Sequence, residues 1–175
     1  GNARNDTEST QAPKSTPLIG YSVVNTYAHD TSYFTEGLEF YKGQLWESSG
    51  GNNAESPYPS AAGIVDLSKG KIDSKVTLNA AVYFGEGITI FDEQLYQLTW
   101  KNGIGFIYDV KTFKKKREFR IPSPEGWGLT HDSSSLYMSD GSNSIYQIDP
   151  VTIQIKNVLR VTDDNGPVGN LNELE

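Results

Sequence analysis

One five-residue pattern occurs three times in this chain, as Glu36-Gly37-Leu38-Glu39-Phe40, Glu86-Gly87-Ile88-Thr89-Ile90 and Trp127-Gly128-Leu129-Thr130-His131. The first residues of the copies, at positions 36, 86 and 127, are 50 and 41 residues apart. A partial fourth copy begins at Asn172, 45 residues after the third. A repeat of this length is typical of the blades of a β-propeller.

Each copy is followed by the same succession of expected strands and turns. An apolar-aromatic pair comes nine residues after each first residue, at Leu45-Trp46, Leu95-Tyr96 and Leu136-Tyr137. A third strand then ends in aspartate, at Asp66, Asp109 and Asp149, and a last strand is expected at 71–78, 114–121 and 153–161. No segment has a long apolar period of 3.6, so few helices are expected. The alternative is a β-sandwich with accidental internal similarity, but the shared nine-residue offset favours the propeller.

The repeat predicts an all-β chain with about three blades and the start of a fourth. Residues 1–17 are polar and are expected to form a disordered tether, and residues 18–175 form the N-terminal part of the propeller domain. Because a ring needs roughly four to eight blades, we expect further C-terminal blades, absent from this sequence, to close it. The strand expected around Tyr21 to Tyr27 would pair with the missing last blade.

Composition excludes several classes of protein. The 175 residues carry a formal net charge of −7, which argues against a nucleic-acid partner. The absence of cysteine excludes disulfides and thiolate chemistry, and two histidines far apart in sequence, His29 and His131, make a multi-histidine metal site improbable. No apolar run approaches the roughly 18 residues of a transmembrane segment. A polar tether before a cysteine-free domain suits an exported protein: periplasmic, membrane-tethered as a lipoprotein, or secreted.

The first positions of the copies are expected to converge, because the innermost strands of a propeller line its central channel. These positions hold Glu36, Glu86, Trp127 and Asn172. A carboxyl group beside aromatic walls loses hydration, which raises its pKa and suits it to proton transfer. The alternative is that these residues are solvated at a channel mouth and only cap their strands.

Several motifs, in the same order along the chain, resemble those of the plant and bacterial glutaminyl cyclases. They are 33–39 (Tyr-Phe-Thr-Glu-Gly-Leu-Glu), 83–89 (Tyr-Phe-Gly-Glu-Gly-Ile-Thr), 98–102 with 106–109, 125–132 (Glu-Gly-Trp-Gly-Leu-Thr-His-Asp) and 170–175. The resemblance extends from about Ile19 to Glu175. It implies a propeller of five blades when complete, which converts an N-terminal glutaminyl residue to pyroglutamate and releases ammonia without a metal or cofactor.

The resemblance also assigns roles to particular residues. It implies that Glu86 is the proton-transferring acid and that Asn172 stabilises the reacting carboxamide. It implies an aromatic substrate pocket formed by Phe34, Phe84, Trp100 and Trp127. Glu36 is a departure, since many relatives carry Gln there; a second carboxyl group is expected to raise a pKa of the pair.

We therefore expect a metal-independent glutaminyl-peptide cyclotransferase acting on N-terminal glutaminyl peptides or proteins. The alternative is a non-catalytic propeller that binds a peptide or protein through its channel face, since this fold supports many functions. Glu86 beside paired tryptophans favours the enzyme.

Overall fold

Three four-stranded antiparallel sheets form the body of the computed structural model, which describes residues 16–175. Blade 1 contains β1 (Phe34–Tyr41), β2 (Gln44–Gly50), β3 (Ala61–Asp66) and β4 (Lys71–Thr77). Blade 2 contains β5 (Gly85–Phe91), β6 (Gln94–Thr99), β7 (Ile104–Asp109) and β8 (Lys115–Arg120). Blade 3 contains β9 (Leu129–His131), β10 (Leu136–Ser139), β11 (Ser144–Ile148) and β12 (Ile155–Arg160). A hairpin of β13 (Thr162–Asp163) and β14 (Gly166–Pro167) follows.

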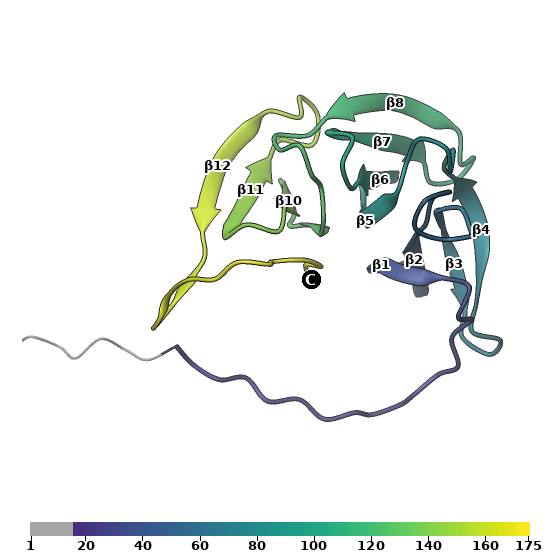
Figure 1. The fold of residues 1–175 in the computed structure, drawn as a ribbon, viewed down its shortest axis with the longest axis horizontal. Helices are drawn as coiled ribbons and strands as arrows, with labels where there is room; N and C mark the ends of the chain where they lie inside the picture. Colours follow the sequence, from purple (N-terminus) through teal and green to yellow (C-terminus); the bar gives the residue numbers. More distant parts are fainter. Residues whose placement is uncertain (1–15) are drawn as a thin grey trace, which may run out of the picture.

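The arrangement of these sheets confirms the predicted propeller architecture. In every blade the strands pair in chain order, without a crossover. The blades stand around a common centre, with β1 and β5 nearest to it and β4, β8 and β12 at the periphery (Figure 1); in blade 3 the inner edge strand is β9, which pairs with β10. No helix occurs in residues 16–175, and the described chain therefore contains none long and apolar enough to cross a membrane.

The aspartates at the ends of the third strands close the outer turns. In each blade the aspartate Oδ1 accepts the backbone N–H two residues further on, in the pairs Asp66–Ser68, Asp109–Lys111 and Asp149–Val151. This Asx-turn geometry explains why the repeat retains an aspartate before each turn.

Blade 2 is buried on both faces because it packs against blade 1 on one side and blade 3 on the other. Successive side chains of a strand point to opposite sides, so each strand of blade 2 can contribute to both contacts. Leu95 of β6 packs with Trp46 of blade 1 in one apolar cluster. Its neighbour Tyr96 packs with Leu136 and Met138 of blade 3 in a second cluster. The apolar-aromatic pair of the repeat thus supplies one side chain to each inter-blade core.

The glycine after each first residue lets the innermost backbones approach one another. A Cβ atom at Gly37 would lie 2.8 Å from the Ile88 nitrogen, and one at Gly87 would lie 2.5 Å from the Trp127 carbonyl oxygen. The Gly87 N–H donates to that same oxygen at 2.8 Å, which joins blades 2 and 3. A Cβ atom at Gly128 would likewise meet the backbone oxygen of Asn172. A larger residue at these positions would force the blades apart.

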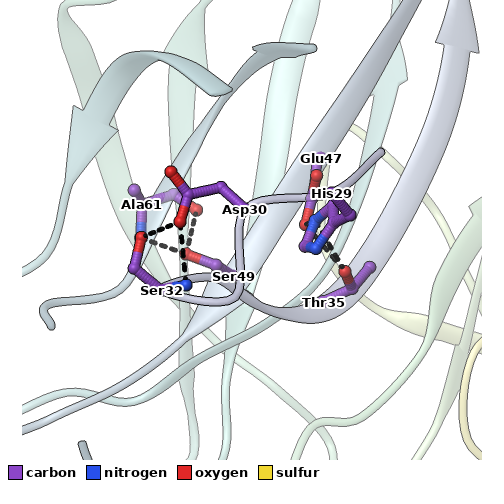
Figure 2. Close-up of polar contacts among 7 residues, drawn as sticks. All are labelled: His29, Asp30, Ser32, Thr35, Glu47, Ser49 and Ala61. Atoms are coloured by element: carbon purple, nitrogen blue, oxygen red, sulfur yellow. Dashed lines mark hydrogen bonds and ion pairs between the residues drawn. The ribbon is translucent and has the colours of Figure 1, made fainter. Parts of the chain in front are cut away.

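Residues 28–33 are fixed to blade 1 by polar contacts. The Glu47 carboxylate on β2 is 1% exposed, and its Oε1 lies 2.7 Å from His29 Nε2 and accepts the Thr35 hydroxyl at 2.7 Å (Figure 2). The Asp30 N–H donates to the Gly70 carbonyl at 2.7 Å. These contacts compensate a buried carboxylate, which would otherwise be costly, and place residues 31–33 beside blade 1.

The predictions about the chain ends are only partly tested by the structure. Residues 21–27 form no strand with the described blades, and Tyr21 is 94% exposed; the pairing of this segment with a last blade, absent from this sequence, stays a prediction. Residues 168–175 also contain no strand, so the expected fourth inner strand at Asn172 is absent. Of the expected tether 1–17, only Thr16 and Pro17 lie within the described residues; the Thr16 N–H and hydroxyl both donate to Asp164.

Replacing Gly87 with alanine is expected to destabilise the full-length protein by about 1–3 kcal/mol, the usual cost of forcing extra atoms into a packed interior. The new methyl group would displace the Trp127 carbonyl and weaken its hydrogen bond to residue 87. Gly169→Ala is the control, since nothing lies within 4 Å of a Cβ atom there. Denaturant unfolding checks the difference; equal stabilities of the two variants would contradict the close-approach argument.

Candidate active site

A cleft of about 520 Å³ opens beside the innermost strands of blades 1 and 2. Its aromatic lining includes Phe34 at the start of β1, Phe84 just before β5 and Trp100 just after β6, together with Tyr33 and Tyr58. Glu36 and Glu86 bring two carboxyl groups into it. The other lining residues are 31–32, 50 and 55–57. The cleft therefore combines apolar walls with Glu36 and Glu86, the combination expected from the sequence, and a third acid, the exposed Glu55, also lines it.

Local strand geometry brings the two acids together. Regular pairing is interrupted between Thr35 and Gly37 in β1 and between Gly85 and Ile88 in β5. Glu36 and Glu86 lie within these two bulges, and a bulge turns a side chain away from the regular alternation of a strand. Because Gly37 packs against the backbone at Gly87 and Ile88, the two bulges are adjacent.

The two carboxyl groups share a hydrogen bond, in which protonated Glu86 donates to Glu36. Glu86 is only 5% exposed, and burial, followed by the nearby negative charge of Glu36, raises its pKa to about 9. Burial raises the pKa of Glu36 to about 7, although the hydrogen bond from Glu86 opposes that shift. Near neutral pH the pair retains its shared proton on Glu86, so a neutral acid faces the cleft.

More distant charges act on the pair in the same direction. Glu173 and Glu125, when ionised, also raise the pKa of Glu86, and burial raises the pKa of Glu173 itself to about 8. Among the described residues, no lysine or arginine lines the cleft. The groups that act electrostatically on Glu86 are therefore all acids, and they favour its protonated form.

The aromatic walls are packed against one another. The rings of Phe84 and Trp100 have centroids 5.6 Å apart and an interplanar angle of 60°. A Cβ atom at Gly50 would lie 2.2 Å from the Phe84 ring, so β2 has room for this ring only because residue 50 is glycine. The Lys101 ammonium group lies 3.4 Å from the centroid of the Trp100 ring, a cation–π contact.

Trp127 does not line this cleft, although the sequence predicted it as a wall. Its indole N–H donates to Glu125 Oε2 at 3.0 Å, and the Trp100 indole N–H donates to the same oxygen at 3.1 Å. Sequence reasoning gave Glu125 no role. The sequence did contain a signal for this contact, because Glu125 lies two residues before Trp127. A half-buried indole N–H needs a hydrogen-bond acceptor, and a nearby carboxylate can supply one.

Asn172 lies in a separate, smaller cleft of about 240 Å³, formed with 35–38 and Glu173. Glu36 lines both clefts, so Asn172 is close to one member of the acid pair. Its backbone oxygen accepts the Ser139 hydroxyl at 2.6 Å. The structure thus gathers Phe34, Glu36, Phe84, Glu86 and Trp100 in one cleft, with Trp127 and Asn172 in its surroundings.

The two histidines make contacts of other kinds. His29 contacts Glu47, and His131 Nδ1 lies 2.8 Å from the hydroxyl of Thr89. Burial lowers the pKa of His131. Within residues 16–175, no three His, Asp or Glu side chains are grouped as ligands for a metal ion.

Residues 2–175 match the model of the glutamine cyclotransferase family. The chain belongs to this family. The glutaminyl-peptide cyclotransferase of Arabidopsis thaliana is 36% identical over 155 residues, which cover 87% of this chain and 46% of that protein. Membership confirms the resemblance found in the sequence motifs.

Solved structures agree with this assignment. The crystal structure of Myxococcus xanthus glutaminyl cyclase matches with a TM-score of 0.74 and 28% identity, over 87% of this chain and 61% of that one. The computationally designed Ika4 protein matches with a TM-score of 0.51 and 12% identity, over 90% of this chain and 87% of that one, a likeness of fold alone. The chain spans less than half of the Arabidopsis glutaminyl-peptide cyclotransferase and less than two thirds of the Myxococcus glutaminyl cyclase.

The acid pair is expected to make stability fall as pH rises. The folded protein holds protons on Glu36 and Glu86 up to pKa values of about 7 and 9, whereas unfolded glutamates lose them near 4.5. Between these limits the unfolded state binds fewer protons, so the free energy of unfolding decreases with increasing pH. Glu86→Gln removes the ionisation, and its melting temperature should fall less than that of the parent between pH 5 and about pH 9.

Glu118→Gln on β8 is the matched control, because this side chain is exposed. Thermal unfolding of the three full-length proteins across this pH range provides the test. Parallel curves for the parent and Glu86→Gln would contradict a buried, protonated Glu86.

Proposed function

We propose that the full-length protein is a glutaminyl-peptide cyclotransferase, which converts the N-terminal glutamine of peptides or proteins to pyroglutamate and releases ammonia. One observation carries the proposal: a hydrogen-bonded pair of carboxyl groups, from buried Glu86 and half-buried Glu36, inside an aromatic cleft. Membership of the glutamine cyclotransferase family supports it. A propeller that only binds peptides has no need for a buried acid pair, whose carboxyl groups are costly to desolvate.

The reaction is intramolecular. The α-amine of the substrate attacks its own γ-carboxamide carbon, a new C–N bond closes a five-membered ring, and the carboxamide C–N bond breaks. One proton leaves the attacking amine and one reaches the departing nitrogen, which leaves as ammonia. The site therefore needs to hold the folded-back conformer and to transfer a proton between two nitrogens of the substrate.

Glu86 is suited to the proton transfer. With its pKa raised to about 9, its carboxyl group can donate a proton to the departing nitrogen. The resulting carboxylate then accepts the proton from the attacking amine, so the acid is restored after each turnover. Glu36, as the acceptor of the Glu86 hydrogen bond, fixes the orientation of the acid.

The remaining predicted residues complete the site. Phe34, Phe84 and Trp100 exclude water and confine the substrate, and Trp127 supports Trp100 through their common acceptor. We assign to the Asn172 amide the stabilisation of the oxyanion that develops on the carboxamide, because Asn172 shares a cleft wall with Glu36. The proposal includes peptides as substrates, catalysis without metal or cofactor, and further blades that close the ring. Export of the protein remains a prediction from the sequence.

Glu86→Gln in the full-length protein should reduce turnover by roughly 100-fold or more, the usual contribution of general acid–base catalysis. The amide keeps the size of the side chain but cannot transfer the proton. KM should change little, because the aromatic walls supply most of the substrate contact. Ammonia release from a short peptide beginning with Gln measures both constants.

Glu36→Gln provides the comparison within the pair. It should retain substantial activity and lower the apparent pKa of the pH–rate profile, because it removes a negative charge beside Glu86. Normal turnover by Glu86→Gln would refute the mechanism. If Glu36→Gln were instead the inactive variant, the catalytic acid would lie on blade 1.

Exhaustive chelation with EDTA should leave the turnover of the full-length protein unchanged. The proton transfer proposed here uses carboxyl groups, and His29 and His131 are occupied by contacts with Glu47 and Thr89. Dialysed protein without added chelator is the control. Loss of activity that zinc restores would contradict a metal-independent reaction.

A further inference from the structure

Two tryptophans from different blades meet at a single carboxylate. Trp100 follows β6 of blade 2, and Trp127 precedes β9 of blade 3. Both indole N–H groups donate to Oε2 of Glu125, at 3.1 and 3.0 Å. Glu125 lies in the connection between β8 and β9, so it belongs to neither of the strands next to the tryptophans.

The backbone that follows Glu125 is hydrogen-bonded to both neighbouring blades, 2 and 3. The Gly126 N–H points at the end of β6, 3.3 Å from the Thr99 carbonyl and 3.1 Å from that of Trp100. The Trp127 N–H donates to the Ser139 carbonyl on β10 at 3.1 Å. The Glu125 side chain therefore starts from a fixed point between blades 2 and 3.

The other contacts of the two indole rings are apolar or cation–π contacts of the ring faces and edges. They do not involve the indole N–H groups, which donate to Glu125. Trp100 contacts the Phe84 ring and the Lys101 ammonium group. The ring of Trp127 packs so closely on Gly141 that a Cβ atom there would lie 2.8 Å from it. A hydrogen bond to a charged acceptor is stronger and more directional than these contacts.

We propose that Glu125 is a positioning residue, whose carboxylate ties Trp100 to Trp127 and thereby fixes the position of Trp100 as a wall of the substrate cleft. This inference rests on the proposed function for its kinetic consequence, but the tie between the indoles is a property of the fold. Glu125 contacts no substrate and transfers no proton; it acts through the two rings.

The charge of Glu125 has a second, separable effect. The groups that act electrostatically on Glu86 are Glu36, Glu173 and Glu125, and all three favour its protonated form. Removing the charge at position 125 while keeping its acceptor oxygen should therefore move the pH–rate profile to lower pH without displacing the rings.

Two substitutions in the full-length protein separate geometry from charge. Glu125→Gln keeps an amide oxygen that can accept both indole N–H groups. We expect its KM for a Gln-initiated peptide to stay within about twofold of the parent and its pH profile to shift to lower pH. Glu125→Ala removes the acceptor, and its KM should rise between about 10-fold and 100-fold, the cost of a misplaced pocket wall. Glu118→Gln, an exposed acid on β8, should match the parent.

Near-UV circular dichroism of the tryptophans supplies a readout that does not depend on activity. Glu125→Ala should alter the tryptophan bands, whereas Glu125→Gln and Glu118→Gln should preserve them. A parent-like KM for Glu125→Ala in an active enzyme would overturn the positioning role. If the parent protein has no cyclase activity, the proposed function fails separately, and an unchanged spectrum of Glu125→Ala would then refute the tie itself.

Discussion

The close approach of the innermost backbones is the constraint on which the site depends. The Gly87 N–H reaches the Trp127 carbonyl at 2.8 Å, and Gly37 packs directly against the backbone of Gly87 and Ile88. These contacts leave no space for side chains between the inner strands, so the residues before the glycines must point elsewhere. At Glu36 and Glu86 the bulges provide that other direction. The close packing of blades 1 and 2 at Gly37 and Gly87 thus places Glu36 and Glu86 beside each other.

The acid pair illustrates how a site is maintained against its own electrostatics. Two carboxyl groups in contact would repel each other if both were ionised, and burial makes each charge more costly. Here the conflict is resolved by a shared proton rather than by a cation. Glu47, which is also buried, has different partners: it contacts the His29 ring and accepts a hydrogen bond from Thr35. Blade 1 therefore contains two glutamates with different partners: Glu36 shares a proton with Glu86, and Glu47 contacts His29 and Thr35.

The sequence predicted the blades well because their signals are local. Apolar alternation, the turn aspartates and the strand lengths all act within one repeat, and the inner strand pairs with the next strand along the chain. It also predicted that Glu36 and Glu86 converge. The sequence did not predict the role of Glu125. One carboxylate that joins two blades occurs once in the chain, so it does not appear in the repeat pattern. Trp127 and Asn172 were expected in the same cleft, but the inner strand of blade 3 begins only at Leu129, so Trp127 lacks the bulge that turns Glu36 and Glu86.

The pairing of strands in chain order has a consequence for how the molecule forms during synthesis. Each sheet needs only residues from its own repeat, so a blade can complete its hydrogen bonds soon after its last strand leaves the ribosome. Its two faces cannot be completed in the same way, because Trp46 and Ala62 of blade 1 are covered only when blade 2 arrives. Every newly made blade therefore presents an uncovered apolar face for as long as the next one takes to emerge. At about 5–20 residues per second, that interval is a few seconds per blade, a window in which chaperones can protect the nascent chain.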